Sequence, residues 1–364
     1  MTLLKHAAAA VAVAIIIGLL TFRLDSYRDY QIAEVAAYVV AVAGLTILIG
    51  LSGQISVGNG AFMAIGAYTT ALLQLHAGWL DHLHITGTWQ ITVILIASLL
   101  VAAVGGAAFG LAAARLRGPY LAGATLMLAV AIPVSVADKY AGVFGGDQGL
   151  GVTITTPSVL GPAFSPTRWL AWLTCAAALI VLIALANLSR SRVGRSWRAL
   201  RDDEVAASLA GLNVARLQVL GFAISAACAG VGGGLLAIVS SIVSPGAYTL
   251  TLSIGLLTAA VIGGLGSIVG AVWGSALLVL VPSYLMNVAG SHGGKLFGLS
   301  SGSSPFVPIA AYGVVLIAVM LLFPTGIQGG VRRLFGPAVP RAAEPFGLLR
   351  RRGPASEHQE EGTI

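Results

Sequence analysis

Charged residues are scarce in this chain. Asp, Glu, Lys and Arg together make up 9% of its 364 residues, whereas soluble domains carry about a quarter. Hydrophobic residues make up 57%, and the mean hydropathy is +0.92. This composition excludes a soluble globular protein. The apolar residues occur in runs of about 18 to 25, the length that a helix needs to cross roughly 30 Å of hydrocarbon.

Cysteine is almost absent, and both of its occurrences, Cys175 and Cys228, fall inside apolar runs. A disulfide framework is therefore excluded, and we expect two small buried side chains. A loop after the third apolar run contains His76, Asp81, His82 and His84. Because no second ligand cluster accompanies this loop, we expect a solvated loop, no metal site and no cofactor.

Ionisable residues are missing from the centres of the apolar runs. Glu34 lies near one end of its run, and Asp138 lies just beyond the end of another. Carriers driven by protons or sodium ions usually keep a titratable group near the middle of the membrane, so this absence disfavours such a carrier. An ion-coupled secondary carrier remains an alternative, as does a channel or a membrane scaffold.

A phosphate-binding loop is also missing. The nearest approach to the pattern G-x-x-x-x-G-K-[ST] is GGKL at residues 293–296, and Ala289 and Leu296 both break it. If ATP drives this protein, another chain must hydrolyse it. The net charge of +7 does not indicate nucleic-acid binding, because the Arg residues form short blocks between apolar runs and at the C-terminus.

Ten apolar segments are long enough to span a membrane. We predict an all-α polytopic membrane protein of about ten transmembrane helices in two five-helix halves, separated by a loop with room for a short surface element, Lys139 to Arg168. No small-x-small cleavage site follows Leu20, so the first segment is expected to be a retained helix. The segments are residues 7–22, 31–51, 61–78, 89–114, 119–137, 169–188, 217–240, 250–265, 270–288 and 306–323.

The distribution of Lys and Arg predicts the orientation. With a cytoplasmic N-terminus, fifteen of these residues face the cytoplasm and five face the other side. The positive-inside rule therefore places both termini in the cytoplasm. The tail, residues 331–364, mixes Arg, Pro and Glu without apolar periodicity, which predicts a disordered cytoplasmic segment.

A polar, glycine-rich patch, SGQISVGNG, separates the second and third segments. An ordinary cytoplasmic loop would be basic, and this patch carries no charge. We therefore expect it to dip toward the bundle centre, where irregular backbone is tolerated if protein surrounds it or if it lines a wet cavity. Asn59, as candidate cap of the next helix, would help to present free N–H groups to a carboxylate. The candidate pathway residues here are Ser52, Gly53, Gln54, Ser56, Gly58 and Asn59.

A second glycine-rich interruption lies in the second half, in the stretch AAVIGGLGSIVGAVWGSALL at residues 259–278. Two such interruptions, one in each half, are typical of a transporter built from structural repeats, near its pathway. The alternative for both patches is that small residues only let the helices pack closely. The candidate pathway residues here are Gly263, Gly264, Gly266 and Ser267.

The long cytoplasmic connection, residues 189–216, is basic at its front and acidic in its middle. From Trp197 to Ala210 it can form an amphipathic helix, which Gly211 would end. Such a helix fits a groove in a partner protein, and a helix lying on lipid is the alternative. The residues expected to couple to the partner are Trp197, Arg198, Arg201, Glu204, Ala206, Ala207 and Gly211.

Within this connection, DEVAASLAGLNV resembles the "EAA" coupling loop of ABC-importer permeases, in which Ala-Ala is followed after three residues by Gly. Val205 stands where the Glu of that motif would be, and Glu204 precedes it. A wider pattern resembles the permeases of branched-chain amino-acid ABC importers, of the larger of the two permease types. The stretches that carry it are LSGQISVGNGAFMAIGAY (51–68), GGDQGL (145–150), GRSWRALRDDEVAASLAGLNV (194–214), SPGAYTLTLSIGLLTAAVIGGLGSIVGAVWGSALL (244–278) and FPTGIQG (323–329).

This resemblance implies a permease domain, residues 1–330, in the inner membrane, with a fold similar to the ten-helix permeases of vitamin B12 importers. It also implies a second, similar permease around one pathway, surrounded by membrane lipid. Two cytoplasmic ATP-binding subunits would hold the coupling helices, and an extracytoplasmic binding protein would deliver leucine, isoleucine or valine. Because urea importers and some aromatic-acid importers use similar permeases, another small solute is the alternative. The chain itself would not be an enzyme.

Overall fold

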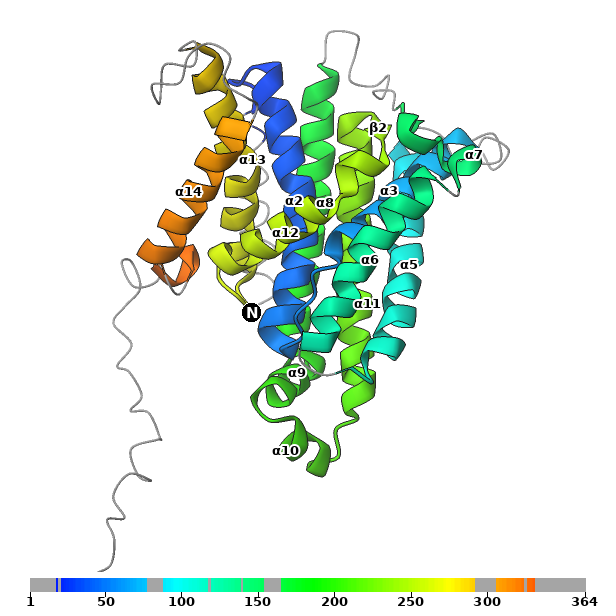
Figure 1. Cartoon of the computed structure of the whole chain (residues 1–364), viewed down its shortest axis with the longest axis vertical. Helices are drawn as coiled ribbons and strands as arrows, with labels where there is room; N and C mark the ends of the chain where they lie inside the picture. The colour runs from blue at the N-terminus through cyan, green and yellow to red at the C-terminus, as the bar shows by residue number, and fades with distance from the viewer. Residues whose placement is uncertain are drawn as a thin grey trace, which may run out of the picture.

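The structure is a computed structural model that describes residues 18, 21–76, 88–116, 119–138, 140–153, 165–291, 306–323 and 326–330. Within these residues, seven helices are long and apolar enough to cross a membrane, and they form one bundle (Figure 1). The prediction of a helical, polytopic membrane protein is confirmed at this level. The predicted first span, residues 7–22, lies almost wholly outside the described residues, as does the predicted tail, residues 331–364.

The other predicted spans all contain a helix in the described part of the chain. The bounds agree closely for the span at residues 119–137, whereas the helix predicted from residue 31 begins at Ser26. The elements are α2 (Ser26–Ser52), α3 (Asn59–Leu75), α5 (Thr88–Ala113), α6 (Pro119–Ala137), α7 (Ala141–Phe144), η1 (Gly146–Gln148), β1 (Leu150–Gly151), α8 (Pro166–Arg190), α9 (Arg192–Asp202), α10 (Glu204–Leu209), α11 (Val214–Ser240), β2 (Ile242–Val243), η3 (Pro245–Tyr248), α12 (Leu250–Gly263), α13 (Ile268–Ser291) and α14 (Phe306–Leu322).

The core of the bundle is formed by α2 and α11, the two most buried membrane-spanning helices among the described residues. Glycines let α11 approach its neighbours closely, because a Cβ at Gly233 would overlap the backbone of Met63 in α3. Likewise, a Cβ at Gly66 of α3 would overlap the backbone of Gly230 in α11. These two glycines lie outside the two predicted patches and show the close packing that small residues allow between membrane helices.

The two halves of the sequence are interleaved in space. Helix α11 belongs to the second half, yet it packs against α2, α3 and α5 of the first, and α8 packs along α2 (Figure 1). The core therefore depends on contacts between helices that are far apart in the chain. The count of ten helices and the similarity to vitamin B12 permeases remain predictions.

Helices α9 and α10 protrude at one end of the bundle, and we call the opposite end the distal end (Figure 1). At the distal end, the loop after α6 contains α7, η1 and β1, and β1 pairs antiparallel with β2. Leu150 lies opposite Val243, and Gly151 lies opposite Ile242. The sequence predicted room for a surface element in this loop but not the strand pairing, because strands of two residues have no hydrophobic periodicity to detect.

Candidate functional site

The polar patch between α2 and α3 returns into the bundle, as predicted (Figure 1). Helix α3 begins at Asn59, whose Nδ2 donates to the carbonyl oxygen of Ala41 at 3.3 Å. Ala41 lies near the middle of α2, about 16 Å from the end of that helix at a rise of 1.5 Å per residue. After the end of α2, the chain therefore turns back along that helix, and α3 begins beside the middle of α2.

Hydroxyl groups satisfy the backbone of this re-entrant segment. The Val57 amide donates to Thr125 Oγ1 of α6 at 3.0 Å, and the Gly60 amide donates to Ser253 Oγ of α12 at 3.2 Å. Irregular backbone at membrane depth needs such partners, since an unsatisfied N–H group there costs several kcal/mol. The segment is thus held between α6 and α12, two helices far apart in the sequence.

The prediction that Asn59 caps α3 is wrong. Gly58 occupies the N-cap position, and no side chain caps the helix. The Asn59 side chain instead spans the core, because it donates to Ala41 of α2 and its Oδ1 accepts from Ser225 Oγ of α11 at 3.3 Å. The Gly60 and Ala61 amides also already donate within the protein, to Ser253 and to Gly58.

Most of the residues predicted to line a pathway in this segment are buried. Only Gly53 among them is exposed, while its neighbour Ile55 is 52% exposed and Val57 is half-buried. The segment therefore reaches the surface of this chain at Gly53 and Ile55, and in part at Val57, whose amide donates to Thr125 of α6. The buried ones are Ser52, Gln54, Ser56, Gly58 and Asn59.

The second interruption forms the turn between α12 and α13. Gly264 and Gly266 adopt φ values of 113° and 79°, which favour glycine. Gly263 ends α12, and Ser267 Oγ accepts from the Gly270 amide at 3.2 Å in the first turn of α13. This turn stays at the end of the bundle near α9, because Gly266 lies against the backbone of Gly50 in the last turn of α2.

The predicted single helix from Trp197 to Ala210 is wrong. The structure has two helices, α9 and α10, separated by Asp203 in an extended conformation with φ −157° and ψ 112°. The Asp203 carboxylate accepts from the amides of Val205 and Ala206 at 2.8 and 3.0 Å, so it caps α10. Because this cap satisfies the first amides of α10, the chain can change direction at Asp203. Gly211, at φ 83°, follows α10, as the sequence predicted.

Trp197 anchors α9 to the bundle. Its side chain is fully buried, and its Nε1 donates to the carbonyl oxygen of Leu217 at the start of α11 at 2.9 Å. Leu200 and Ala207 are buried as well. The predicted apolar side of the connection therefore faces this chain's own helices, and Trp197 is not available to a partner protein.

Arg201 connects α9 to the end of α2. Its Nη1 donates to the Gly50 carbonyl oxygen at 2.7 Å, and Gly53 packs so closely on its side chain that a Cβ there would lie 2.9 Å from Arg201 Cγ. Since Gly50 also touches Gly266, one arginine lies where α2, α9 and the α12–α13 turn meet. We call this place the junction. Arg198 and Arg201 are both exposed, but the hydrogen bond to Gly50 comes from Arg201.

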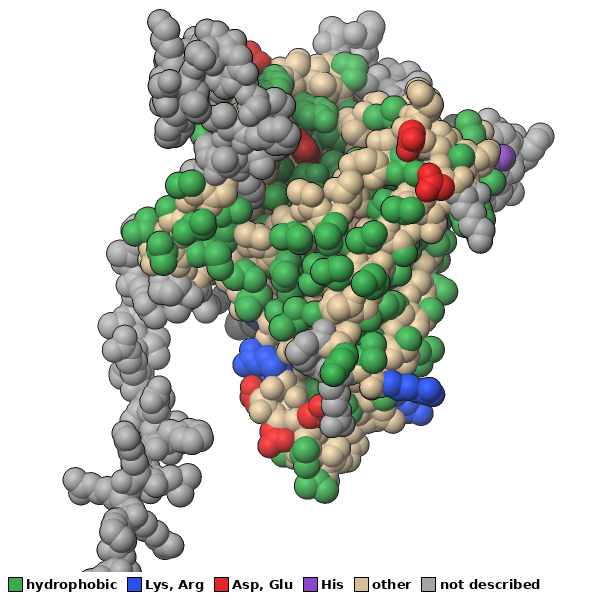
Figure 2. Space-filling view, in the orientation of Figure 1, with side chains coloured by type: hydrophobic (Ala, Val, Ile, Leu, Met, Phe, Trp, Pro, Cys, Tyr) green, Lys and Arg blue, Asp and Glu red, His purple; other side chains and the backbone are tan. Residues whose placement is uncertain are grey.

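Helix α10 presents an apolar surface that the sequence reasoning missed. Val205 and Leu209, one helical turn apart, are 68% and 83% exposed. Figure 2 shows hydrophobic side chains at the tip formed by α10, next to acidic ones. Beside them, Glu204 and Ser208 line a hollow of about 360 Å³ between α10, α11 and the end of α5. In the sequence, the spacing of four residues between Val205 and Leu209 could have indicated this apolar surface, because residues four apart share one face of a helix.

Comparison with known proteins identifies the family of the chain. Residues 27–324 match the model of a family described as branched-chain amino acid transport system / permease component. The chain is 34% identical over 266 residues to the high-affinity branched-chain amino acid transport system permease protein LivM of Escherichia coli. The alignment covers 67% of this chain and 60% of LivM. The chain thus spans about 60% of the length of that relative.

Two further relatives are covered almost fully. The chain is 27% identical over 303 residues to the permease protein BraD of Pseudomonas aeruginosa and 28% identical over 309 residues to LivH of Salmonella typhimurium. Each alignment covers 81% of this chain and 92% of the relative. No solved structure matches the chain. Because the family model covers most of its residues, the chain belongs to the family of branched-chain amino acid transport system permease components.

Proposed function

We propose that this chain is the permease subunit of an ATP-binding-cassette importer and forms half of the pathway for leucine, isoleucine and valine. The observation that carries the proposal is the re-entrant segment, which places irregular backbone at mid-depth, held by hydroxyl groups of α6 and α12. Irregular backbone at this depth is typical of the pathway of a transporter. The three relatives, all named as permease proteins of branched-chain amino acid transport systems, support the substrate class.

The pathway runs along the face of this chain formed by α6 and α12, against a second, similar permease. Part of the re-entrant segment reaches the surface beside α6, at Val57, whose amide donates to Thr125 of that helix. Figure 2 shows that hydrophobic side chains cover much of the same face, as expected of a surface that packs against another membrane protein. Because the predicted pathway residues Ser52, Gln54, Ser56, Gly58 and Asn59 are buried, they act by shaping and supporting this surface.

ATP hydrolysis by the partner subunits drives the permease through α10. The sequence contains no phosphate-binding loop, so two separate ATP-binding subunits hydrolyse ATP, and one of them receives α10 of this chain in a groove. Exposed Val205 and Leu209 are the side chains that fill this groove. An extracytoplasmic binding protein delivers the substrate to the distal end. In this importer, α10 and both termini lie in the cytoplasm, as the distribution of Lys and Arg predicts, and the bundle lies in the inner membrane.

The junction transmits the motion. When the ATP-binding subunits move α10, α9 moves with it, and Arg201 carries the displacement to Gly50 at the end of α2. Gly266 lies against Gly50, so the α12–α13 turn follows. Since α2 and α12 both hold the start of α3, through Asn59 and Gly60, the displacement reaches the re-entrant segment.

Uptake by the reconstituted importer tests the function. The chain is placed in vesicles with the permease, ATP-binding and binding-protein subunits encoded by neighbouring genes, and uptake of labelled leucine, isoleucine, valine and urea is measured. We expect ATP-dependent uptake of the three amino acids. Uptake of urea alone would contradict the substrate, and uptake by this chain alone, driven by an ion gradient without ATP, would contradict the class of transporter.

Arg201→Met tests the junction. The substitution keeps the aliphatic packing on Gly53 but removes the charged hydrogen bond to Gly50, and such bonds contribute about 1.5–3 kcal/mol. We therefore expect amino acids transported per ATP hydrolysed to fall about tenfold or more, while the subunits still assemble. Arg198→Met, one helical turn away at an exposed position, is the matched control and should retain coupling. Equal losses in both variants would contradict a special role for Arg201.

A further inference from the structure

A groove between α2 and α13 opens at the distal end of the bundle. Its upper part is a cavity of about 460 Å³, and its lower part is a cavity of about 240 Å³ between α2, α8 and α13. Both cavities are lined by Ile32 and Leu280, so they adjoin along the two helices. We call the two together the α2–α13 groove.

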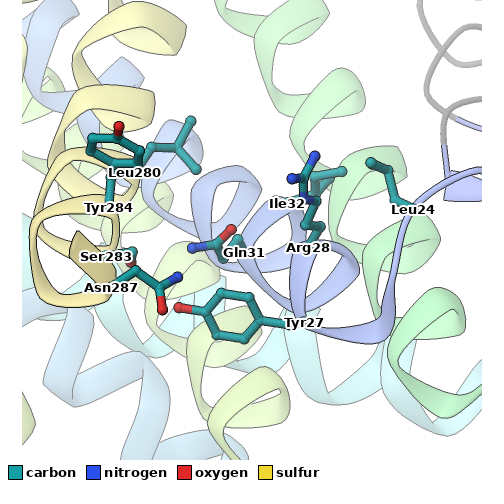
Figure 3. A pocket seen from close by; sticks show the side chains of 9 residues that line it. All are labelled: Leu24, Tyr27, Arg28, Gln31, Ile32, Leu280, Ser283, Tyr284 and Asn287. Carbon is teal, nitrogen blue, oxygen red and sulfur yellow. The ribbon is translucent and has the colours of Figure 1, made fainter. Parts of the chain in front are cut away.

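The upper cavity has both apolar and polar walls and carries one positive charge. Figure 3 shows that Tyr27 and Gln31 of α2 point toward Asn287 of α13, with Ser283 next to Asn287, whereas Arg28 points away from this group and lies next to Ile32. All of the polar side chains among these can donate hydrogen bonds. The described residues that line this cavity include one cation, Arg28, and no carboxylate. The mouth of the groove is therefore suited to an anion.

The lower cavity is apolar. From Ile32 it extends along α2 to Val39, which is about 10 Å deeper in the membrane-spanning part of the helix. Its other walls come from Cys175 and Leu182 of α8 and from Val272 of α13. A hydrophobic slot at this depth excludes water and accepts a hydrocarbon chain.

We propose that the α2–α13 groove binds one phospholipid of the adjoining leaflet, with the phosphate at Arg28 and one acyl chain in the lower cavity. This ligand matches both parts at once, because the guanidinium offers a phosphate charge-assisted hydrogen bonds and the lower cavity accepts the acyl chain. A free amino acid fits less well, because it would fill only the upper cavity and its ammonium group would find no carboxylate there. The inference depends on the membrane location of the chain and not on its substrate.

Photolabelling in the assembled importer tests the site. The probe is phosphatidylglycerol with a photoreactive group near the end of one acyl chain, incorporated into vesicles that contain the importer. We expect labelling concentrated on α8 between Cys175 and Leu182. Arg28→Gln removes the charge at the mouth and should lower this labelling about fivefold or more, in line with the loss of one charge-assisted hydrogen bond.

Two matched controls separate the groove from the general lipid surface. Arg23→Gln removes an exposed arginine near the same end that does not line the groove, and it should leave the labelling unchanged. Leu179→Trp fills the lower cavity and should abolish labelling on α8, whereas Ile180→Trp, at a position that is 69% exposed outside the groove, should not.

Other outcomes would overturn the proposal. These are labelling spread evenly over the helices that face lipid, equal effects of the two arginine substitutions, and displacement of the probe by excess leucine. The last result would identify the groove as a solute site. Each can occur whether or not the chain transports branched-chain amino acids, so the uptake experiment remains an independent test.

Discussion

Replacing Val205 and Leu209 together with Asp is expected to abolish coupled uptake. Both side chains are more than two-thirds exposed on α10, and we place them in an apolar groove of the ATP-binding subunit. Two carboxylates buried there would be unpaired, which is among the most costly changes at an interface. Uptake should fall about 100-fold or more, corresponding to roughly 3 kcal/mol, while the ATP-binding subunits lose their attachment to the permease, measured by co-purification.

Conservative variants control for this experiment. Val205→Ile and Leu209→Met keep an apolar surface of similar volume and should preserve both uptake and co-purification. The Asp variants should still insert into the membrane and retain their thermal unfolding temperature, because neither side chain is buried in this chain. Normal uptake by the double Asp variant would remove α10 from the coupling mechanism.

Introducing a side chain at Gly233 is expected to unfold the core. A Cβ there would overlap the backbone of Met63, and no rotamer change relieves a clash with backbone. Gly233→Val should therefore destabilise the protein by about 3 kcal/mol or more, at or beyond the upper end of usual overpacking costs. We expect a large drop in the unfolding temperature in detergent, or no recovery of folded protein.

Gly123→Val in α6 is the matched control. A Cβ at Gly123 would have no heavy atom within 4 Å, and the residue is exposed on the surface of the chain. The change from Gly to Val in a helix is otherwise the same, so this variant should unfold within a few degrees of the wild type. If both variants unfolded alike, the close approach of α3 and α11 would not be the source of the stability.

The spans were predictable because hydropathy reports directly on burial in lipid or protein. The error at the start of α2 has a tertiary cause. Its first turn contains Asp29, which reads as a loop residue, yet the structure buries it and places its Oδ2 3.6 Å from Arg168 Nε at the start of α8. A single sequence cannot reveal a partner more than a hundred residues away.

The position of the re-entrant segment was predictable because the sequence between α2 and α3 lacks charged residues. A patch without charge between two apolar runs indicated a segment inside the bundle, and the structure confirms it. The role of Asn59 was not predictable in the same way, because its side chain does not cap α3 but forms hydrogen bonds with Ala41 of α2 and Ser225 of α11. Similarly, nothing near Arg201 in sequence points to Gly50, so the junction emerges only from the fold.

The β1–β2 pairing has a mechanical consequence for the distal surface. Backbone hydrogen bonds tie the loop after α7 to the turn after α11, and the Val152 amide reinforces them by donating to the Ser241 carbonyl oxygen at 2.9 Å. A protein that binds to this loop and displaces it would therefore also displace the end of α11. The pairing of β1 with β2 thus connects the distal loop mechanically to α11, one of the two most buried membrane-spanning helices among the described residues.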